Sequence, residues 1–64
     1  MNKISVVYWK ENDFWIGYLL EYPDYRTQGS TLDELKENIK DIYKEIDEGT
    51  VPGVHKASIM ELIV

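Results

Sequence analysis

The sequence contains no cysteine and a single histidine, His55, in 64 residues. The absence of cysteine excludes disulfides, thiolate zinc sites and thiol nucleophiles together. A metal site built on one histidine would need several carboxylates around it, so we expect neither a metal nor another cofactor. Because a chain this short buries only about 60% of the surface that its unfolded form exposes, we expect oligomerisation or a partner protein to supply the missing support.

Long hydrophobic runs are also missing. No stretch approaches the roughly 20 apolar residues that span a bilayer, and the apolar run near the start is far too short for a secretory signal. We therefore expect one domain, residues 1–64, located in the cytoplasm and not associated with a membrane.

Basic residues are in the minority, with 7 Lys and Arg against 12 Asp and Glu, which gives a net charge of −5. This balance opposes direct binding to nucleic acid, since affinity there comes largely from Lys and Arg on phosphates. Most of the excess negative charge falls in residues 33–48, which hold seven acids and three lysines. The segment is either a solvated surface that keeps the protein soluble or an acidic surface offered to a basic partner.

The stretch from Gln28 to Gly49 predicts one amphipathic helix. Thr31 and Glu34 fit a capping box, in which each side chain accepts from the backbone N–H of the other residue, and Ser30 is a competing cap one position earlier. Gly49 can adopt the left-handed conformation that ends a helix. The apolar positions recur at helical spacing on one side of this segment: Leu32, Leu35, Ile39, Ile42, Tyr43 and Ile46.

The residues before this helix predict strands. Lys3–Lys10 and Phe14–Glu21 are rich in β-branched and aromatic residues. The polar turn Glu11–Asp13 suits a short hairpin loop, and Asn12 within it tolerates a positive φ.

A second turn and two further strands complete the expected fold. Tyr22–Tyr25 places Pro23 at the second position of a turn, where its fixed φ fits, and Tyr25–Gln28 is then a short third strand. His55–Val64, after a loop marked by Gly and Pro, reads as a final strand. The sequence therefore predicts an α+β fold of order β-β-β-α-β, an antiparallel sheet with one helix packed on one face.

Both faces of the expected strands are substantially apolar, which is unusual for an antiparallel sheet with one wet side. One helix of about 17 residues is about 25 Å long and can cover only one face. We expect the uncovered face, or a sheet edge, to be buried by another chain, and a homo-oligomer (a dimer or higher) to contribute to this burial.

Residues for catalysis are sparse. Glu21 and Glu61 are the acids expected on strands, and neither has an obligatory partner on the helix, so a two-metal nuclease site is not favoured. His55 has no nucleophile motif around it. An enzyme that uses Glu21 and Glu61 is the third and weakest of the alternatives.

The order of features resembles the N-terminal domain of the HicB antitoxin family. A hairpin with the aromatic second strand FWIGY at residues 14–18 leads to Pro23, then to TQGSTLDEL at residues 27–35 and ENIK at residues 37–40. The resemblance covers nearly the whole chain, and its most specific part is the Gly-x-Thr-x-x-Glu start of the helix after a proline turn.

The resemblance implies a partial ribonuclease-H-like fold without the catalytic acids of that fold. It also implies a role in binding and silencing a small basic HicA-type ribonuclease toxin. The sequence departs from the family at Pro23-Asp24, where members commonly have Pro-Gly. Many members also carry a C-terminal DNA-binding segment used for autorepression, and we expect no such segment after the last expected strand.

We therefore predict a non-catalytic protein-binding domain that neutralises a basic ribonuclease by covering its active site or RNA-binding surface. The alternative is a solitary homo-oligomeric structural or regulatory domain with an unrelated partner or ligand. We expect four acids of the helix to steer the approach of the basic partner, and tryptophan side chains to supply most of the binding affinity. The predicted partner-binding residues are Asp33, Glu37, Asp41, Glu45, Trp9 and Trp15.

Overall fold

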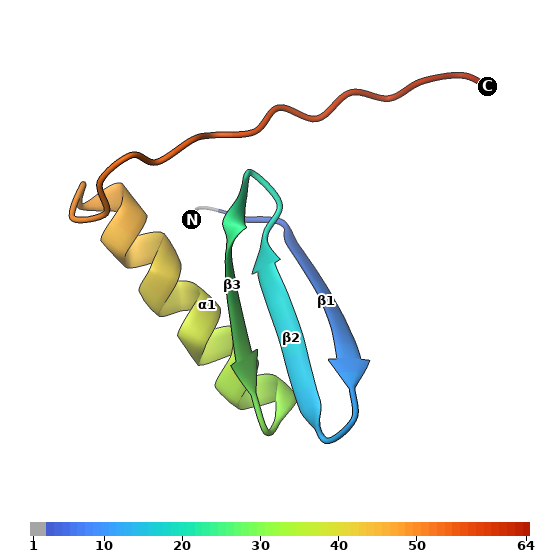
Figure 1. Cartoon of the computed structure of the whole chain (residues 1–64), viewed down its shortest axis with the longest axis vertical. Helices are drawn as coiled ribbons and strands as arrows, with labels where there is room; N and C mark the ends of the chain where they lie inside the picture. The colour runs from blue at the N-terminus through green and yellow to red at the C-terminus, as the bar shows by residue number, and fades with distance from the viewer. Residues whose placement is uncertain (1–2) are drawn as a thin grey trace.

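The computed structural model describes residues 3–64 and contains a three-stranded antiparallel sheet followed by one helix. The strands β1 (Val6–Glu11), β2 (Phe14–Leu19) and β3 (Tyr22–Gly29) are neighbours in chain order, and α1 (Leu32–Asp47) packs over β2 and β3 on one face (Figure 1). The predicted α+β class with one covered sheet face is confirmed. No helix in the described part of the chain is long and apolar enough to cross a membrane.

The hairpin between β1 and β2 closes through a two-residue turn, Asn12-Asp13, with Glu11 opposite Phe14. Asn12 has φ of 55°, a left-handed conformation that asparagine tolerates better than most residues. The expected hairpin loop is confirmed, and its length fixes which side chains of β1 and β2 share a face.

The second turn lies earlier than predicted. The chain reverses at Leu20-Glu21, and Pro23 falls inside β3 instead of in a turn at Tyr22–Tyr25. The pairing of β2 with β3 is irregular here. Leu19 lies opposite Tyr22, but its neighbour Tyr18 lies opposite Arg26, so β3 contains extra residues at this point. A bulge on an edge strand tolerates a proline because no ladder hydrogen bond is lost there.

The start of α1 follows the prediction with one change. Thr31 is the N-cap, and its hydroxyl oxygen accepts from the N–H of Glu34 at 3.1 Å. The carboxylate of Glu34 accepts from the N–H and the hydroxyl of Ser30, at 3.4 and 3.0 Å, and not from the N–H of Thr31 as a capping box predicts. Ser30 therefore supports the cap from outside it, and the start of the helix is still fixed by local hydrogen bonds.

The helix ends in a Schellman motif, as the position of Gly49 predicts. The N–H of Gly49 donates to the carbonyl of Ile46 at 3.1 Å, and the N–H of Thr50 donates to the carbonyl of Glu45 at 3.1 Å. Gly49 has φ of 73°, the left-handed conformation that this motif requires.

The core lies between α1 and the sheet and is small. Its fully buried hydrophobic residues are Leu19, Leu35 and Ile39. Partly buried residues pack around this cluster: Val6, Trp15, Tyr22, Leu32, Ile42, Tyr43 and Ile46. All six apolar positions predicted on the helix therefore face the sheet.

The predicted final strand, His55–Val64, is wrong. The segment is extended, but among residues 3–64 no strand lies beside it. The N–H of Ala57 donates to the carbonyl of Glu21 at 2.6 Å, and the Lys56 ammonium lies 3.3 Å from the Glu21 carboxylate. The extended segment after α1 crosses above the end of the sheet where β2 turns into β3, and it ends beyond the β1 side (Figure 1). A strand needs a neighbour for its N–H and C=O groups, so β-type composition does not form one alone.

Candidate functional site

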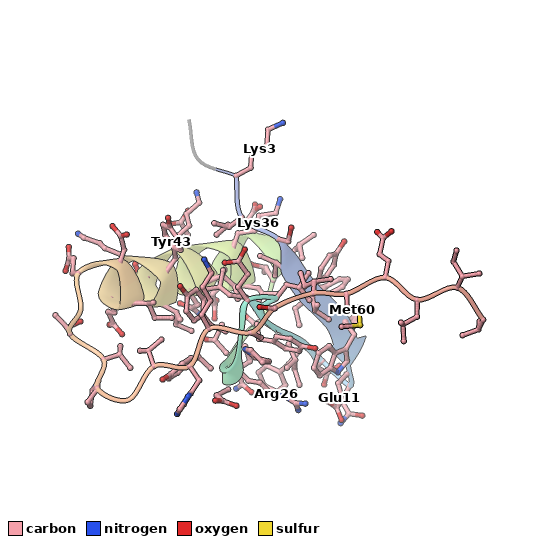
Figure 2. The ribbon with its side chains drawn as sticks, turned by 90° about the horizontal axis from the view of Figure 1, so that it is seen from above. Lys3, Glu11, Arg26, Lys36, Tyr43 and Met60 are labelled. Atoms are coloured by element: carbon pink, nitrogen blue, oxygen red, sulfur yellow. The ribbon has the colours of Figure 1, made fainter. Side chains whose placement is uncertain are left out.

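The sheet face turned away from α1 carries an aromatic cluster built around an arginine. The rings of Trp9 and Tyr18 meet edge to face with centroids 6.2 Å apart. The Arg26 guanidinium carbon lies 5.3 Å from the Trp9 ring centroid and 5.9 Å from that of Tyr18. Figure 2 places Arg26 on the side of the sheet opposite Lys36 and Tyr43 of the helix. A cation over aromatic faces orders this cluster.

Strand register explains why these side chains meet. Trp9 lies opposite Ile16, and Tyr18 lies opposite both Val7 on β1 and Arg26 on β3, so they all share one face. The indole N–H of Trp9 donates to the Glu11 carboxylate at 3.3 Å. Within residues 3–64, no helix or strand covers this face. The predicted uncovered apolar face is present, with Val7, Trp9, Phe14, Ile16, Tyr18 and Arg26 on it.

Trp15 lies on the other face of the sheet. It packs against the core below α1, with its ring 6.0 Å from that of Tyr8 and with the Lys10 ammonium 5.7 Å from its centroid. Trp15 pairs with Lys10, and Trp9 pairs with Ile16. Because side chains of successive strand residues point to opposite faces, Trp15 and Trp9 lie on opposite faces of the sheet. A flat partner surface can therefore contact one of the two predicted tryptophans at a time.

The four predicted acids form an exposed row on α1, which we call the acidic stripe: Asp33, Glu37, Asp41 and Glu45. Because they recur every four residues on the side of the helix opposite the buried Leu35 and Ile39, they point away from the sheet. Glu37 pairs with Lys40 at 3.4 Å, where both side chains are largely exposed. The acidic stripe and the Trp9 cluster thus occupy opposite sides of the molecule.

The acids considered for catalysis do not form a centre. The carboxylate of Glu21 is engaged by Lys56, and Glu61 is exposed in the extended segment after α1. Residues 3–64 contain no group of three or more His, Cys, Asp or Glu side chains that could hold a metal ion. His55 is exposed beside this segment.

A polar groove of about 720 Å³ lies where the end of α1 meets the β2–β3 turn and the start of β1. Its charged lining residues are Lys3, Lys56, Glu21 and Asp47, two of each sign. Because Lys56 already pairs with Glu21, the groove offers no excess charge to attract an ionic ligand.

Two members of the aromatic cluster were missed by reasoning from the sequence. Tyr18 could have been found, because a two-residue turn between β1 and β2 fixes its face relative to Trp9. Arg26 could not, because the bulge in β3 changes the phase of every side chain after it.

Comparison of the chain with protein-family models, curated proteins and solved structures finds no match.

Proposed function

We propose that this chain is a non-catalytic protein-binding domain of HicB type, which neutralises a small basic ribonuclease by covering its active site or RNA-binding surface. The observation that carries the proposal is the acidic stripe, whose four carboxylates are all exposed on one side of α1. The family and the toxin class come from the sequence resemblance, and the geometry supports a basic partner.

The stripe has the form of a nucleic-acid mimic. Residues four apart on a helix are separated by about 6 Å along its axis, so the stripe presents evenly spaced negative charges in a row. A protein surface that binds RNA is complementary to such a row, because Lys and Arg on that surface neutralise phosphates. An acidic helix laid on the same surface competes with RNA for it.

The stripe also disfavours the helix that holds it. Like charges four residues apart destabilise a helix by a few tenths of a kcal/mol per pair, and Asp33, Glu37, Asp41 and Glu45 form three such pairs. Lys36, Lys40 and Lys44 each lie three residues after an acid of the stripe, and Lys40 pairs with Glu37, so part of this repulsion is offset. Residues 33–48 still hold seven acids against three lysines, and this negative charge supports a cationic partner.

The test is co-expression with the product of any short reading frame that lies beside this gene and encodes a small basic protein. We expect a complex at an ionic strength of about 0.05 M that weakens steeply with added salt. The double variant Asp41→Asn, Glu45→Gln should weaken it by roughly tenfold or more.

The matched control is Asp13→Asn, Asp24→Asn, which makes the same change in net charge at exposed positions outside α1. It should leave the complex nearly unchanged. Equal loss in both variants would show that only net charge matters, and a basic neighbour that does not co-purify would refute the antitoxin role.

The alternative function, a homo-oligomeric structural or regulatory domain, is favoured by a different observation. The extended C-terminal segment and the outer edge of β1 both lack a strand partner within residues 3–64.

A further inference from the structure

Residues 58–64, here called the arm, are extended, and their side chains lie in solvent. The arm holds five large hydrophobic residues with exposed fractions between 61% and 117%. They are Ile59, Met60, Leu62, Ile63 and Val64. Apolar side chains gathered in this way, next to free backbone N–H and C=O groups, mark a segment that pairs with another surface.

The direction of the arm is fixed at its base. The hydrogen bond of Ala57 and the ion pair of Lys56, both to Glu21, hold the base at the turn between β2 and β3. In both figures the segment then runs past the β1 side of the sheet and ends beyond it. Residues 54–64 contain no glycine, proline, asparagine or aspartate, and Ser58 is their one residue of a type that favours tight turns. In the structure the arm continues outward and does not fold back on its own sheet.

The outer edge of β1 is the matching feature. In the described residues β1 pairs with β2 alone, and α1 packs over β2 and β3 instead of over β1. An apolar groove of about 340 Å³ is left between β1 and α1. Its lining residues are Ile4, Val6 and Tyr8 from the β1 side and Leu32, Leu35, Lys36, Ile39 and Lys40 from the helix.

The arm and the groove match in spacing. Ile4, Val6 and Tyr8 recur every second residue along the edge, and Met60, Leu62 and Val64 recur every second residue along the arm. In a strand such residues point to one face, so the three apolar side chains of an added strand would lie over the groove.

We propose that the arm of one copy adds as a β-strand to the free edge of β1 in a second copy, with Met60, Leu62 and Val64 in the groove of that copy. A second copy is the occupant because each chain carries both the arm and the groove. A two-fold pair then makes the contact twice and satisfies both free edges. This assembly is independent of the acidic stripe, which lies on the outer side of α1.

The test measures self-association of the full chain by sedimentation equilibrium from about 1 μM to about 1 mM. Leu62→Lys alters the arm, Tyr8→Lys alters the groove, and each should weaken dimerisation by about tenfold or more. The matched control is Phe14→Lys, since Phe14 is about as exposed as Tyr8 (44% against 54%) but lies on the opposite sheet face. It should leave the dimer intact. Circular dichroism checks that each variant keeps its fold.

Mixing the two weakened variants gives the sharpest result. Neither Leu62→Lys nor Tyr8→Lys retains a good contact with itself, but a mixed pair joins the unaltered arm of one to the unaltered groove of the other. We expect the mixture to associate more strongly than either variant alone.

Three outcomes would overturn the proposal: a wild-type chain that stays monomeric at every concentration, a mixture no stronger than its components, or a dimer sensitive to Phe14→Lys alone. A monomer would mean that the arm pairs within its own chain or serves a different partner. Sensitivity to Phe14 would mean that copies pack through the Trp9 face.

Discussion

Close approach of α1 to the sheet depends on individual glycine residues. A Cβ on Gly17 would lie 3.0 Å from the backbone carbonyl oxygen of Val7 and 3.3 Å from a methyl carbon of the Leu35 side chain, so its neighbours would have to give by a few tenths of an ångström. A Cβ on Gly29 would lie 2.6 Å from the backbone nitrogen of Leu35 and 3.0 Å from the carbonyl carbon of Glu34. Backbone atoms inside the first turn of a helix cannot move without moving the helix. Gly29, which directly precedes Ser30 and Thr31 of the cap, is thus the position where one methyl group matters most.

We predict that Gly29→Ala lowers the free energy of unfolding by about 1–3 kcal/mol or more, the usual range for overpacking, measured as a shift of the urea midpoint. The matched control is Gly49→Ala, where no atom lies within 4 Å but φ is +73°. That variant should cost about 1 kcal/mol through backbone strain alone. A Gly29→Ala protein as stable as wild type would show that the first turn of α1 can shift freely.

At the scale of elements, the helix is determined by residues close together in the sequence, whereas a strand also needs a second strand to pair with. The cap at Thr31, the apolar side of α1 and the end at Gly49 each depend on residues within about a turn, and all were predictable. The turn at Leu20-Glu21 was missed because Pro23 suits both a turn and an edge bulge. The expected strand at His55–Val64 has strand composition, but composition does not name a pairing partner.

The candidate site follows the same division. The acidic stripe was predictable because helical spacing alone places its four members together. The Trp9 cluster was only half predictable, because its Arg26 depends on the bulge in β3. The sequence named Trp9 and Trp15 without assigning them to a face, and the strand register puts them on opposite faces.

The stripe gives the second prediction, which concerns α1 as a whole. Glu45→Lys replaces a like-charge pair with Asp41 by an attractive one and puts a cation near the helix C-terminus. We expect the variant to be more stable by about 0.5–1 kcal/mol at low salt. The gain should shrink at about 1 M NaCl, where the Debye length is about 3 Å.

Glu45→Gln is the control for this prediction, since it removes the repulsion without adding the attraction and should give about half of the gain. Urea titration at both salt concentrations measures it. A loss of stability in the lysine variant would mean that Glu45 makes a favourable contact, and the stripe would no longer disfavour its own helix.

For the whole molecule, the balance between buried and exposed apolar residues is unusual. Within residues 3–64, three hydrophobic residues are buried, whereas eight large hydrophobic residues have substantial exposure. The eight lie on the groove edge, the uncovered sheet face and the arm, with five of them in the arm. A domain of this size is marginally stable by itself, so a second copy that covers the arm and the groove would add to a core that is otherwise small.

This argument predicts that thermal stability depends on protein concentration. Because two copies bind in the folded state only, raising the concentration from about 10 μM to about 1 mM should raise the Tm of the wild-type chain by several degrees. The Leu62→Lys variant should melt near the dilute wild-type value at both concentrations, since Leu62 is 74% exposed and contributes little within one chain. Differential scanning calorimetry of both proteins at both concentrations measures the effect. A wild-type Tm that does not change with concentration would mean that the small core between α1 and the sheet supports the fold by itself.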